Sequence, residues 1–308
     1  MRIFRHWQDA AASDLNGGAI TVGNFDGVHR GHHQVLDELK EHAKRVGGPS
    51  IVITFDPHPR AVLFPTEAPR RLSHLHERLE YLEKTGVDAV LLLHFDRELA
   101  SWPASQFSRK VFETFRPKHW HVGYDFAFGR GREGSAEALR VLGAELGFRV
   151  TKAAPFEMDH AVVSSSRIRS AIEAADFQLA EKLLGRPYSI SGHVMHGDKR
   201  GRKIGFPTAN LDVADLVHPP IGIYAVRAKC GDDIWNGAAY LGFRPTFNGR
   251  TMVLETHMLD VSPDLYNERL VIEFVQRVRE DRSYKNPQEL SRQIRRDCDA
   301  ARRILAGD

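Results

Sequence analysis

The chain has 308 residues, 42% of them hydrophobic and 27% charged, with 43 basic and 40 acidic side chains. This length predicts two domains, and the near balance of charge does not by itself indicate a nucleic-acid binder. The two cysteines, Cys230 and Cys298, lie far apart, which argues against a disulfide framework and a cysteine-based zinc site. No apolar run approaches the roughly 20 residues that span a bilayer, and no secretory signal pattern is found. We therefore expect a cytoplasmic protein, a monomer or weak homo-oligomer, that binds neither nucleic acid nor membrane.

The first half of the chain alternates between short β-rich runs and helical patterns. The expected strands are 19–22, 50–55, 87–95, 119–124 and 148–154. The expected helices are about 32–46, 72–82, 103–115 with Ser101 as a candidate cap, and 135–147. This alternation predicts a parallel sheet covered by helices, in which ligands bind beyond the carboxyl ends of the strands.

The pattern of expected secondary structure changes after "GRPY" at residues 185–188. Two short helical patterns, 166–175 and 177–184, precede this point. Short β-rich runs broken by Gly, Pro and Asn follow it up to about residue 278, and a last helical pattern covers 287–305. Many short strands with turn signals predict a small barrel or sandwich. We expect one domain over residues 1–186 and a second over residues 187–308.

The stretch "GNFDGVHRGH" at residues 23–32 joins the first expected strand to the first long helix. Glycines permit positive φ angles and close approach of a ligand to the backbone. A helix N-terminus presents N–H groups and a positive dipole end to an anion. The imidazoles of His29 and His32 can add hydrogen bonds to phosphate oxygens, so the stretch predicts a triphosphate site. Zinc is a weaker alternative, because no Cys or carboxylate spacing completes a site, and His33 is expected to be a helix-surface residue.

Three further stretches of the first half have the composition of ligand-binding loops. "GRGREG" at 129–134 matches a dinucleotide-binding fingerprint, but it does not directly follow a strand and the later ribose-binding acid is missing, so we discount it. "SSSRIRS" at 164–170 offers hydroxyls and guanidiniums at a helix start, which suits phosphate oxygens. "TFDPHPR" at 54–60 forms a proline-braced turn that either walls a flat ligand or is a plain loop.

The second half contains a stretch rich in glycine and positive charge, "GHVMHGDKRGRKIGFPTANL" at 192–211. Flexible backbone with positive charge fits a phosphate loop, and a flexible basic hairpin is the alternative. The oxygens of Thr208 and Asn210 suit Mg²⁺, which prefers oxygen ligands. Glu255 lies in the apolar run "LETHMLD", where its carboxylate either takes a proton from a substrate hydroxyl or simply faces outward.

These motifs, in this order, closely resemble those of the bacterial bifunctional riboflavin kinase/FMN adenylyltransferases, also called FAD synthetases. In the first half the resemblance is carried by "GNFDGVHRGH", "TFDPHP", "GYDFAFG" and "SSSRIR". In the second half it is carried by "GRKIGFPTAN", "PPIGIY", "RPTF" and "LETHMLD". The resemblance extends over nearly the whole chain. It implies a Rossmann-like α/β nucleotidyltransferase domain followed by a small antiparallel β-barrel kinase domain with a C-terminal helix.

The resemblance also implies two reactions: riboflavin and ATP give FMN and ADP, and FMN with a second ATP gives FAD and pyrophosphate. The implied cofactor is Mg²⁺, and the implied ligands are riboflavin, FMN, FAD and ATP. An enzyme with only the adenylyltransferase active, its β domain serving as a flavin-binding module, is the alternative. A non-catalytic flavin or nucleotide sensor is disfavoured, because two separate sets of phosphate-type motifs are present.

Residue roles implied by the resemblance follow the motifs of the adenylyltransferase half. The expected ATP-binding residues are Gly23, Asn24, Phe25, His29, His32, Ser164, Ser165, Ser166 and Arg169. The expected flavin-binding residues are Phe55, Pro57, His58, Pro59 and Asp125. His29, His32 and Arg169 are expected to stabilise charge during catalysis, whereas Arg167 occupies a variable place of the motif. No base is required, because the FMN phosphate is already a nucleophile at neutral pH.

The kinase half receives its own set of implied roles. The expected ATP-binding residues are Gly201, Lys203, Gly205, Phe206, Pro207, Thr208 and Asn210, with Thr208 and Asn210 also at the metal. Glu255 is the expected catalytic base, worth roughly 10²–10⁴-fold in rate. The chain departs from the usual family pattern at Tyr240, Asn267 and Tyr284, where Asn, Gly and Phe are common. These departures bear on flavin affinity or loop shape rather than on the reaction class.

Overall fold

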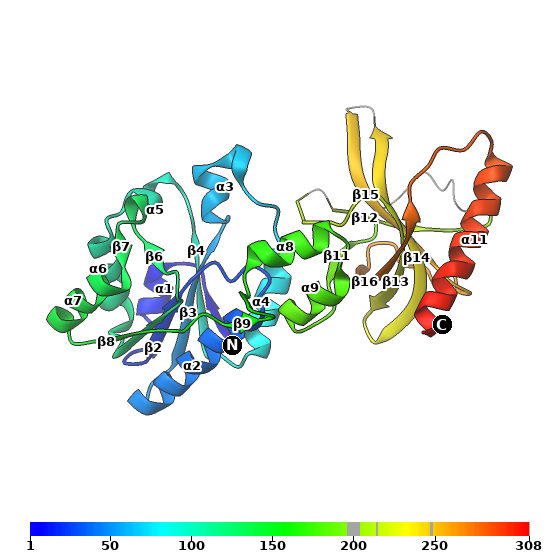
Figure 1. Cartoon of the computed structure of the whole chain (residues 1–308). Helices are drawn as coiled ribbons and strands as arrows, with labels where there is room; N and C mark the ends of the chain where they lie inside the picture. Colours follow the sequence, from blue (N-terminus) through cyan, green and yellow to red (C-terminus); the bar gives the residue numbers. More distant parts are fainter. Residues whose placement is uncertain (196–203, 214, 247–248, 308) are drawn as a thin grey trace. The chain divides into compact units, whose positions relative to one another are not determined.

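The computed structural model describes residues 1–195, 204–213, 215–246 and 249–307 (Figure 1). The chain divides into two compact units, one formed by residues 1–69 and 73–165 and the other by residues 70–72 and 166–308. The second unit includes two helices that precede residue 187, and the expected domain boundary at 186/187 stays a prediction. In the described part of the chain, no helix combines the length and apolar character needed to cross a membrane.

The first unit is built on a six-stranded sheet in the order β1-β4-β3-β2-β5-β8, with every neighbouring pair parallel. Its strands are β1 (Arg2–Phe4), β2 (Ala19–Val22), β3 (Ser50–Asp56), β4 (Ala89–His94), β5 (His119–Val122) and β8 (Arg149–Lys152). Two-stranded pairs lie outside it: β6 (Ala127–Phe128) with β7 (Gly134–Ser135), and β9 (Glu157–Met158) with β10 (Ala161–Val162). The expected α/β class with a parallel sheet is confirmed.

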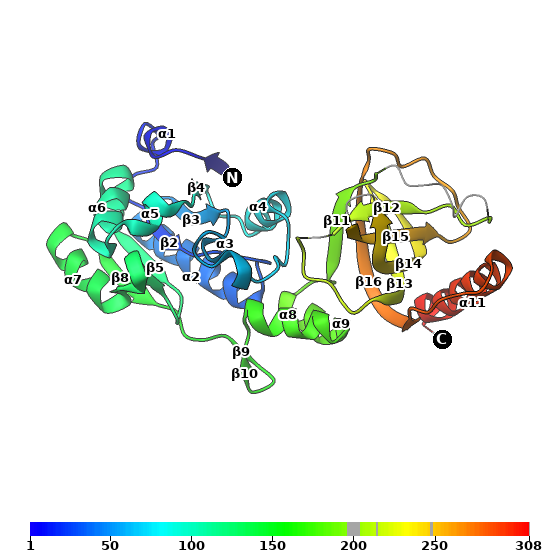
Figure 2. The same cartoon turned by 90° about the horizontal axis from the view of Figure 1, so that it is seen from above.

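Helices cover both faces of this sheet (Figure 2). The helices of the first unit are α1 (Trp7–Ala11), α2 (Arg30–Val46), α3 (Pro59–Leu63), α4 (Leu75–Lys84), α5 (Arg97–Ser101), α6 (Ala104–Phe115) and α7 (Ala136–Leu146). Leu36 and Leu39 of α2 and Leu82 of α4 pack on one face, while Val111 of α6 and Leu139 of α7 pack on the other. Both faces are therefore dry, which explains why the strands read as continuous apolar runs.

Some helix boundaries differ from the expectation. Ser101 is the last residue of the short helix α5 and does not cap α6, whose N-cap is Pro103. Leu72 is buried but lies before α4, which begins at Leu75. The "GRGREG" stretch forms the link between β6 and β7 with a short 3-10 helix at Arg130–Arg132, so it does not join a sheet strand to a helix.

The second unit contains a six-stranded antiparallel sheet in the order β11-β16-β13-β14-β15-β12. Its strands are β11 (Ser189–His193), β12 (Ala209–Asp212), β13 (Gly222–Cys230), β14 (Asp233–Thr246), β15 (Gly249–Met258) and β16 (Arg269–Glu280). The backbone N–H of Met195, just beyond β11, donates to the carbonyl of Asn210 in β12 at 2.9 Å. This bond joins the two edges of the sheet, so the sheet is a nearly closed barrel, as expected.

Three helices belong mainly to the second unit: α8 (Ser165–Glu173), α9 (Phe177–Leu184) and α11 (Pro287–Ala306). Asn286 caps α11 and Pro287 occupies its first turn, which fits the preference for proline there. Cys298 and Ala301 of this helix pack on Ala225 and Ala238 of the barrel. The expected C-terminal helix is confirmed.

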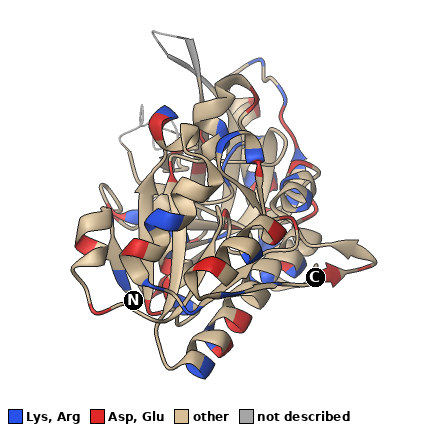
Figure 3. Cartoon of the chain, turned by 90° about the vertical axis from the view of Figure 1, so that its left-hand side faces the viewer, with Lys and Arg blue, Asp and Glu red and all other residues tan. Residues whose placement is uncertain are grey.

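Charges of both signs are interspersed in the first unit rather than gathered by sign (Figure 3). Several form ion pairs one helical turn apart, such as Lys40 with Asp37 at 3.0 Å and Arg140 with Glu137 at 2.7 Å. Exposed pairs of this kind contribute little to stability. An anion must therefore be recognised by local groups rather than by a broad field.

A buried histidine cluster joins α2 to the sheet at a distance from the 23–29 turn. Oγ1 of Thr151 lies 2.8 Å from Nε2 of His119, 2.8 Å from Nδ1 of His121 and 3.2 Å from Nε2 of His42. The rings of His42 and His119 stack with centroids 3.9 Å apart. Burial lowers the pKa of His119 to about 4 and also lowers that of His121 to about 4, although Glu38 beside His121 opposes the shift.

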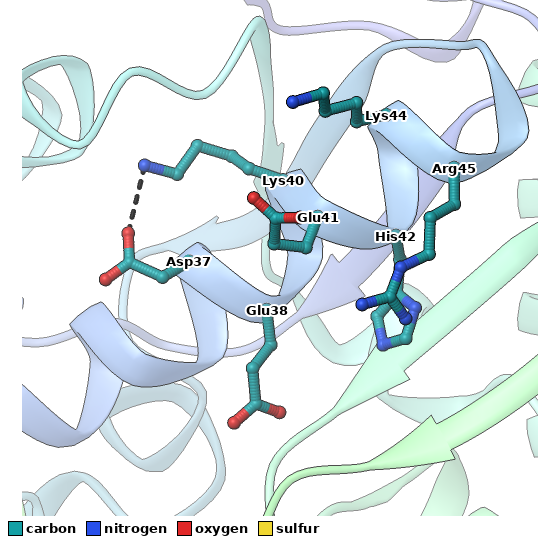
Figure 4. A pocket seen from close by; sticks show the side chains of 7 residues that line it. All are labelled: Asp37, Glu38, Lys40, Glu41, His42, Lys44 and Arg45. Atoms are coloured by element: carbon teal, nitrogen blue, oxygen red, sulfur yellow. Dashed lines mark ion pairs between the residues drawn. The ribbon is translucent and has the colours of Figure 1, made fainter.

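The outer side of α2 beside this cluster is hollowed (Figure 4). Glu38, His42 and Arg45 extend from the helix toward the strands, while Lys40 pairs with Asp37. The hollow has a volume of about 680 Å³, and charged side chains of α2 form its lining. It includes none of the site residues expected from the sequence, so we do not take it as the functional site.

The histidine cluster makes stability fall at mildly acid pH. Because the fold favours neutral imidazoles, the unfolded chain binds more protons between the ordinary pKa of 6.5 and about 4. The free energy of unfolding should therefore fall as pH is lowered through this range, and urea unfolding followed by circular dichroism at several pH values measures it. His121→Gln should flatten this dependence, whereas the exposed His76→Gln should not. An equally steep loss in His121→Gln would contradict the assignment.

Candidate functional site

The strand order of the first unit identifies the edge of its sheet at which a ligand is expected to bind. Connections run from β2 outward through β3 to β4, and the chain then returns to place β5 on the other side of β2. Ligands of open parallel sheets bind at such a reversal, beyond the carboxyl ends of the strands. The segments that follow β2, β3 and β5 all emerge at this edge. They contain the expected residues 23–32, 57–59 and 125, and the expected residue Phe55 lies at the end of β3 itself.

The turn after β2 has an unusual backbone. Phe25 has a φ of 50° and Val28 a φ of 37°, a left-handed conformation that is rare for a β-branched residue such as valine. The side chains of both residues are nonetheless buried, and Asp26 between them is only 5% exposed. Backbone strain of this kind persists where the surroundings fix it and is concentrated at functional sites. The left-handed conformations of Phe25 and Val28 are therefore maintained by the packing of their buried side chains.

His29 and His32 cap helix α2 through a reciprocal exchange. The backbone N–H of His32 donates to Nδ1 of His29, and the backbone N–H of His29 donates to Nδ1 of His32, both at 3.3 Å. The two rings stack with centroids 3.6 Å apart and planes 15° apart. A capping box normally uses a hydroxyl and a carboxylate for these two bonds. Here two imidazoles replace both groups.

This cap leaves the helix start attractive to anions. With Nδ1 accepting a hydrogen bond, the ring proton of each neutral imidazole is assigned to Nε2. The first turn of α2 contains no acidic residue, so no carboxylate offsets the positive end of the helix dipole. Backbone N–H groups of the first turn that have no intrahelical acceptor add further donors. The first turn of α2 can therefore hold a phosphate without an acidic residue of its own that would repel it.

A close approach by another segment locates the serine-rich motif beside this cap. A Cβ atom at Gly31 would lie 3.2 Å from the carbonyl oxygen of Val163 and 3.3 Å from the ring of His29. A side chain at this position would crowd both groups. Ser165, two residues after Val163, donates from Oγ to the carbonyl of Asp26 at 3.1 Å. The structure thus brings the expected Ser164–Ser165 segment to the 23–32 turn.

Arg78 is a central residue of this edge that the sequence analysis missed. It is only 6% exposed, and it donates to the carbonyls of Asn24 at 3.1 Å and Phe55 at 2.8 Å. Its guanidinium also lies 3.8 Å from the carboxylate of Asp56. One side chain from α4 therefore ties the end of β2 to the end of β3.

The expected flavin-binding residues of this unit lie at the end of β3 and on the segments after β3 and β5. Phe55 packs edge-on against Phe95 with ring centroids 5.5 Å apart, and His58 caps α3 by accepting from the N–H of Arg60 at 3.1 Å. Pro59 begins α3, and Asp125 is exposed beyond the end of β5. Their common sheet edge fits the expectation, and their contact with a flavin stays a prediction.

The rest of the "SSSRIR" motif belongs to the second unit. Nε of Arg169 donates to the carbonyl of Arg70 at 2.7 Å, and both residues lie in that unit. Ser166 is exposed in the first turn of α8. Roles for Ser166 and Arg169 at phosphates therefore stay predictions.

The second unit has a cleft beside the "GFPTAN" motif. Thr208 and Asn210 line it together with residues of the 261–266 segment, and its volume is about 190 Å³. Asn210 is buried, and its Nδ2 donates to the carbonyl of Thr208 at 3.3 Å. This bond uses one of the two N–H groups of the Asn210 amide, so its oxygen and its second N–H are the groups it can offer to a ligand. The cleft therefore presents the neutral oxygens of Thr208 and Asn210, and the acidic residue Asp264 also lines it.

Glu255 is positioned by strand register next to this motif. It pairs directly with Asn210 of β12 on one side and with Tyr240 of β14 on the other. Directly paired residues project from the same face of a sheet. The half-buried Glu255 carboxylate is therefore a neighbour of Asn210, as a base near an ATP site requires.

The remaining expected kinase residues flank the motif or fall outside the structure. Phe206 packs edge-on against His257 with ring centroids 5.4 Å apart, and Nδ1 of His257 lies 2.8 Å from the carbonyl oxygen of Pro207. Gly205 adopts a φ of 89°. Gly201 and Lys203 lie outside the described residues. Among the described residues, no group of three or more His, Cys, Asp and Glu side chains is arranged to hold a metal ion.

Comparison with protein-family models matches two consecutive ranges of the chain. A model described as FAD synthetase matches residues 11–167. A model described as riboflavin kinase matches residues 184–305. The first range contains the adenylyltransferase motif residues named above except Arg169, and the second contains the kinase motif residues.

Several bacterial proteins are similar over nearly the full length. The chain is 40% identical to the bifunctional riboflavin kinase/FMN adenylyltransferase of Escherichia coli K12, over 99% of this chain and 98% of that protein. It is 41% identical to the protein of the same description from Pseudomonas fluorescens, over 94% of each. A crystal structure described as a macrolide-efflux protein from Streptococcus pneumoniae superposes with a TM-score of 0.84 at 28% identity, over 97% of this chain and 98% of that one.

The contribution of Arg78 to holding the ends of β2 and β3 together can be measured as a change in the free energy of unfolding. Arg78→Met should lower the free energy of unfolding of the first unit by about 3 kcal/mol, because two buried carbonyls lose their donor. Arg60→Met, which changes an exposed arginine, is the matched control. Thermal unfolding followed by circular dichroism compares the two variants. Equal melting temperatures for both variants would show that Arg78 does not hold the ends of β2 and β3 together.

Proposed function

The chain belongs to the bacterial bifunctional riboflavin kinase/FMN adenylyltransferase family, and we propose that it makes FMN from riboflavin and FAD from FMN. ATP serves as the phosphate donor in the first reaction and as the adenylyl donor in the second. The observation that carries this proposal is the match of one chain to models of both activities over consecutive ranges. No observation favours the alternative in which only the adenylyltransferase is active. We assign the adenylyltransferase to residues 1–186 and the kinase to residues 187–308.

In the adenylyltransferase reaction, a phosphate oxygen of FMN attacks the α-phosphorus of ATP and pyrophosphate leaves. The nucleophile is already ionised, so the protein has to position the reactants and stabilise charge. The Nε2–H groups of His29 and His32 donate to phosphate oxygens as negative charge builds on the leaving group. Ser164, Ser165, Ser166 and Arg169 supply further donors. Gly23, Asn24 and Phe25 form the backbone on which ATP lies.

The flavin of this reaction is placed at the neighbouring strand ends. Phe55 at the end of β3 and Pro57, His58 and Pro59 just after it provide a rigid wall, and Asp125 borders the site after β5. The reversal of strand order between β2 and β5 supports this placement, because it brings both segments to the edge that holds the capped turn.

In the kinase reaction, the 5′-hydroxyl of riboflavin attacks the γ-phosphorus of ATP, and ADP leaves. A hydroxyl is a poor nucleophile, so this step benefits from a base. Glu255 takes the hydroxyl proton as the new O–P bond forms. The pairing of Glu255 with Asn210 supports this role, because it keeps the carboxylate beside the phosphate-binding motif.

The ATP of the kinase reaction lies along the glycine-rich motif. Gly205, Phe206 and Pro207 form the described part of this motif, together with Thr208 and Asn210. Gly201 and Lys203 complete the expected set. The neutral oxygens of Thr208 and Asn210 fit Mg²⁺, which takes oxygen ligands and keeps several waters. When bound, Mg²⁺ would neutralise phosphate charge at this position.

The proposed setting is that of a cytoplasmic enzyme acting on small molecules, as a monomer or a weak homo-oligomer without nucleic-acid or membrane partners. The two proposed reactions need only riboflavin, ATP and Mg²⁺. Purified protein supplied with these three components should form FMN first and FAD later, as followed by HPLC. Absence of both products would contradict the proposed function.

Two sets of variants should separate the two activities. Glu255→Gln should lower FMN formation from riboflavin by roughly 10²–10⁴-fold and leave FAD formation from supplied FMN unchanged. His29→Asn keeps a good capping residue but removes the imidazole donor, and it should lower FAD formation from FMN by about 10²-fold while sparing FMN formation. Rates of each half-reaction by HPLC measure both effects.

Matched substitutions control for general damage. Glu268→Gln changes an exposed carboxylate just before β16, and His33→Asn changes the neighbour of the capping pair; both should behave as wild type. Full FMN formation by Glu255→Gln would show that the base lies elsewhere. Full FAD formation by His29→Asn would show that the imidazole cap does not act on phosphate.

A further inference from the structure

The cleft beside the "GFPTAN" motif is lined by two segments that are distant in the chain. Residues 207–210 of the motif line it, and so do residues 261–266, which precede β16; Val194, just after β11, lines it as well. The cleft has a volume of about 190 Å³, which is below the roughly 300–1,000 Å³ of most small-molecule sites. A small change in the spacing of the two segments is therefore a large change in the room left for a ligand.

The chain just beyond β11 is bonded to both of these segments. On one side, the backbone N–H of Met195 donates to the carbonyl of Asn210 at 2.9 Å. On the other side, Val194 is bonded twice to the turn that ends the second segment. Its N–H donates to the carbonyl of Glu268 at 3.0 Å, and its carbonyl accepts from the N–H of Asn267 at 3.2 Å. The spacing of the two segments thus depends on this short stretch of backbone.

The turn that ends the second segment covers residues 265–268 and has Asn267 at its third position. The N–H of Glu268 donates to the carbonyl of Leu265 at 3.0 Å, and Asn267 has a φ of 64°. A positive φ at the third residue of a turn favours Gly or Asn. Asn267 is thus one of the few residue types that this turn accepts readily.

The imidazole of His193, the last residue of β11, adds a side-chain bond to the same turn. Its Nδ1 lies 3.0 Å from the carbonyl oxygen of Asn267. Because a carbonyl oxygen only accepts, the ring proton is assigned to Nδ1. His193 is exposed to solvent, so its contribution comes from this bond rather than from packing in a core. The imidazole therefore ties the turn to the end of β11, beside the two backbone bonds of Val194.

We propose that His193 is a positioning residue for riboflavin phosphorylation, whose imidazole holds the 265–268 turn to the end of β11 and so sets the spacing between residues 261–266 and the phosphate motif. This inference rests on the proposed function, since it takes the motif as the place of ATP in the kinase reaction. His193 keeps the cleft at the width that ATP needs and does not act on the reacting groups. Loss of its bond should therefore weaken ATP binding and leave the chemical step nearly unchanged.

Two substitutions of His193 separate its hydrogen bond from its bulk. His193→Phe keeps a flat ring and removes the donor, so the KM for ATP in FMN formation should rise about two- to tenfold, the range of one hydrogen bond's net contribution. Its kcat should stay close to the wild-type value, because only binding is affected. His193→Asn should keep the wild-type KM, since its amide nitrogen can replace Nδ1 as the donor. Initial rates of the full chain at saturating riboflavin, with FMN measured by HPLC, give both constants.

Substitutions of Asn267 test the same turn without changing His193. Asn267→Gly should match the wild type, because glycine adopts a φ of 64° at no steric cost. Asn267→Val should raise the KM for ATP in FMN formation, because a β-branched residue is strongly disfavoured at positive φ. The same rate measurements compare the two variants.

FAD formation from supplied FMN is the internal control, since it uses ATP in the adenylyltransferase half of the same chain, and it should be unchanged in every variant. An unchanged KM for ATP in His193→Phe, or an equal rise in His193→Asn, would overturn the inference. A parallel loss of FAD formation would also overturn it, because it would show general damage. If the wild-type chain forms no FMN, the proposed kinase function fails and the role of His193 fails with it. If it forms FMN and the KM for ATP does not respond to His193→Phe, only the role of His193 fails.

Discussion

The anion-binding character of the proposed site in the first unit depends on the reciprocal hydrogen bonds between His29 and His32. They satisfy two N–H groups at the start of α2 without placing a carboxylate there. The positive end of the helix dipole thus remains available, and two ring N–H groups are directed by the same bonds. The strained turn at residues 25–28, the small residue at Gly31 and the clamp from Arg78 all serve to bring this cap to the edge where the strand order reverses.

The two halves of the chain solve different chemical problems with different groups. FMN brings an ionised nucleophile to the adenylyltransferase, so that site consists of donors and backbone. Riboflavin brings a hydroxyl to the kinase, so the site that we propose there includes a carboxylate beside a phosphate motif. In the barrel, antiparallel register places Glu255, the proposed base, directly beside Asn210 of the proposed phosphate motif. The α/β unit uses strand ends instead, where loops from several strands converge.

Much of the fold was predictable because its signals are local. The apolar runs of β3 and β4, the spacing of Leu36 and Leu39, and the proline at the start of α11 each determine their own element. Other features depend on contacts between distant segments. In the sequence, Arg78 cannot be distinguished from a surface residue of a helix. Its contacts form only when α4 packs against the ends of β2 and β3. The His42, His119 and His121 cluster is formed by three separate elements and leaves no motif. The spacing of His29 and His32 indicated a phosphate role, but the exchange of hydrogen bonds between them was not visible in the spacing.

The tautomers of His29 and His32 test the central claim most directly. Long-range ¹H–¹⁵N spectra of the imidazole rings, assigned with His29→Asn and His32→Asn, report which ring nitrogen carries the proton. At a pH of about 7.5, both rings should be neutral with the proton on Nε2, and addition of ATP should shift the Nε2 resonances of both. Protonation at Nδ1 in either ring, or Nε2 resonances that do not respond to ATP, would contradict the account.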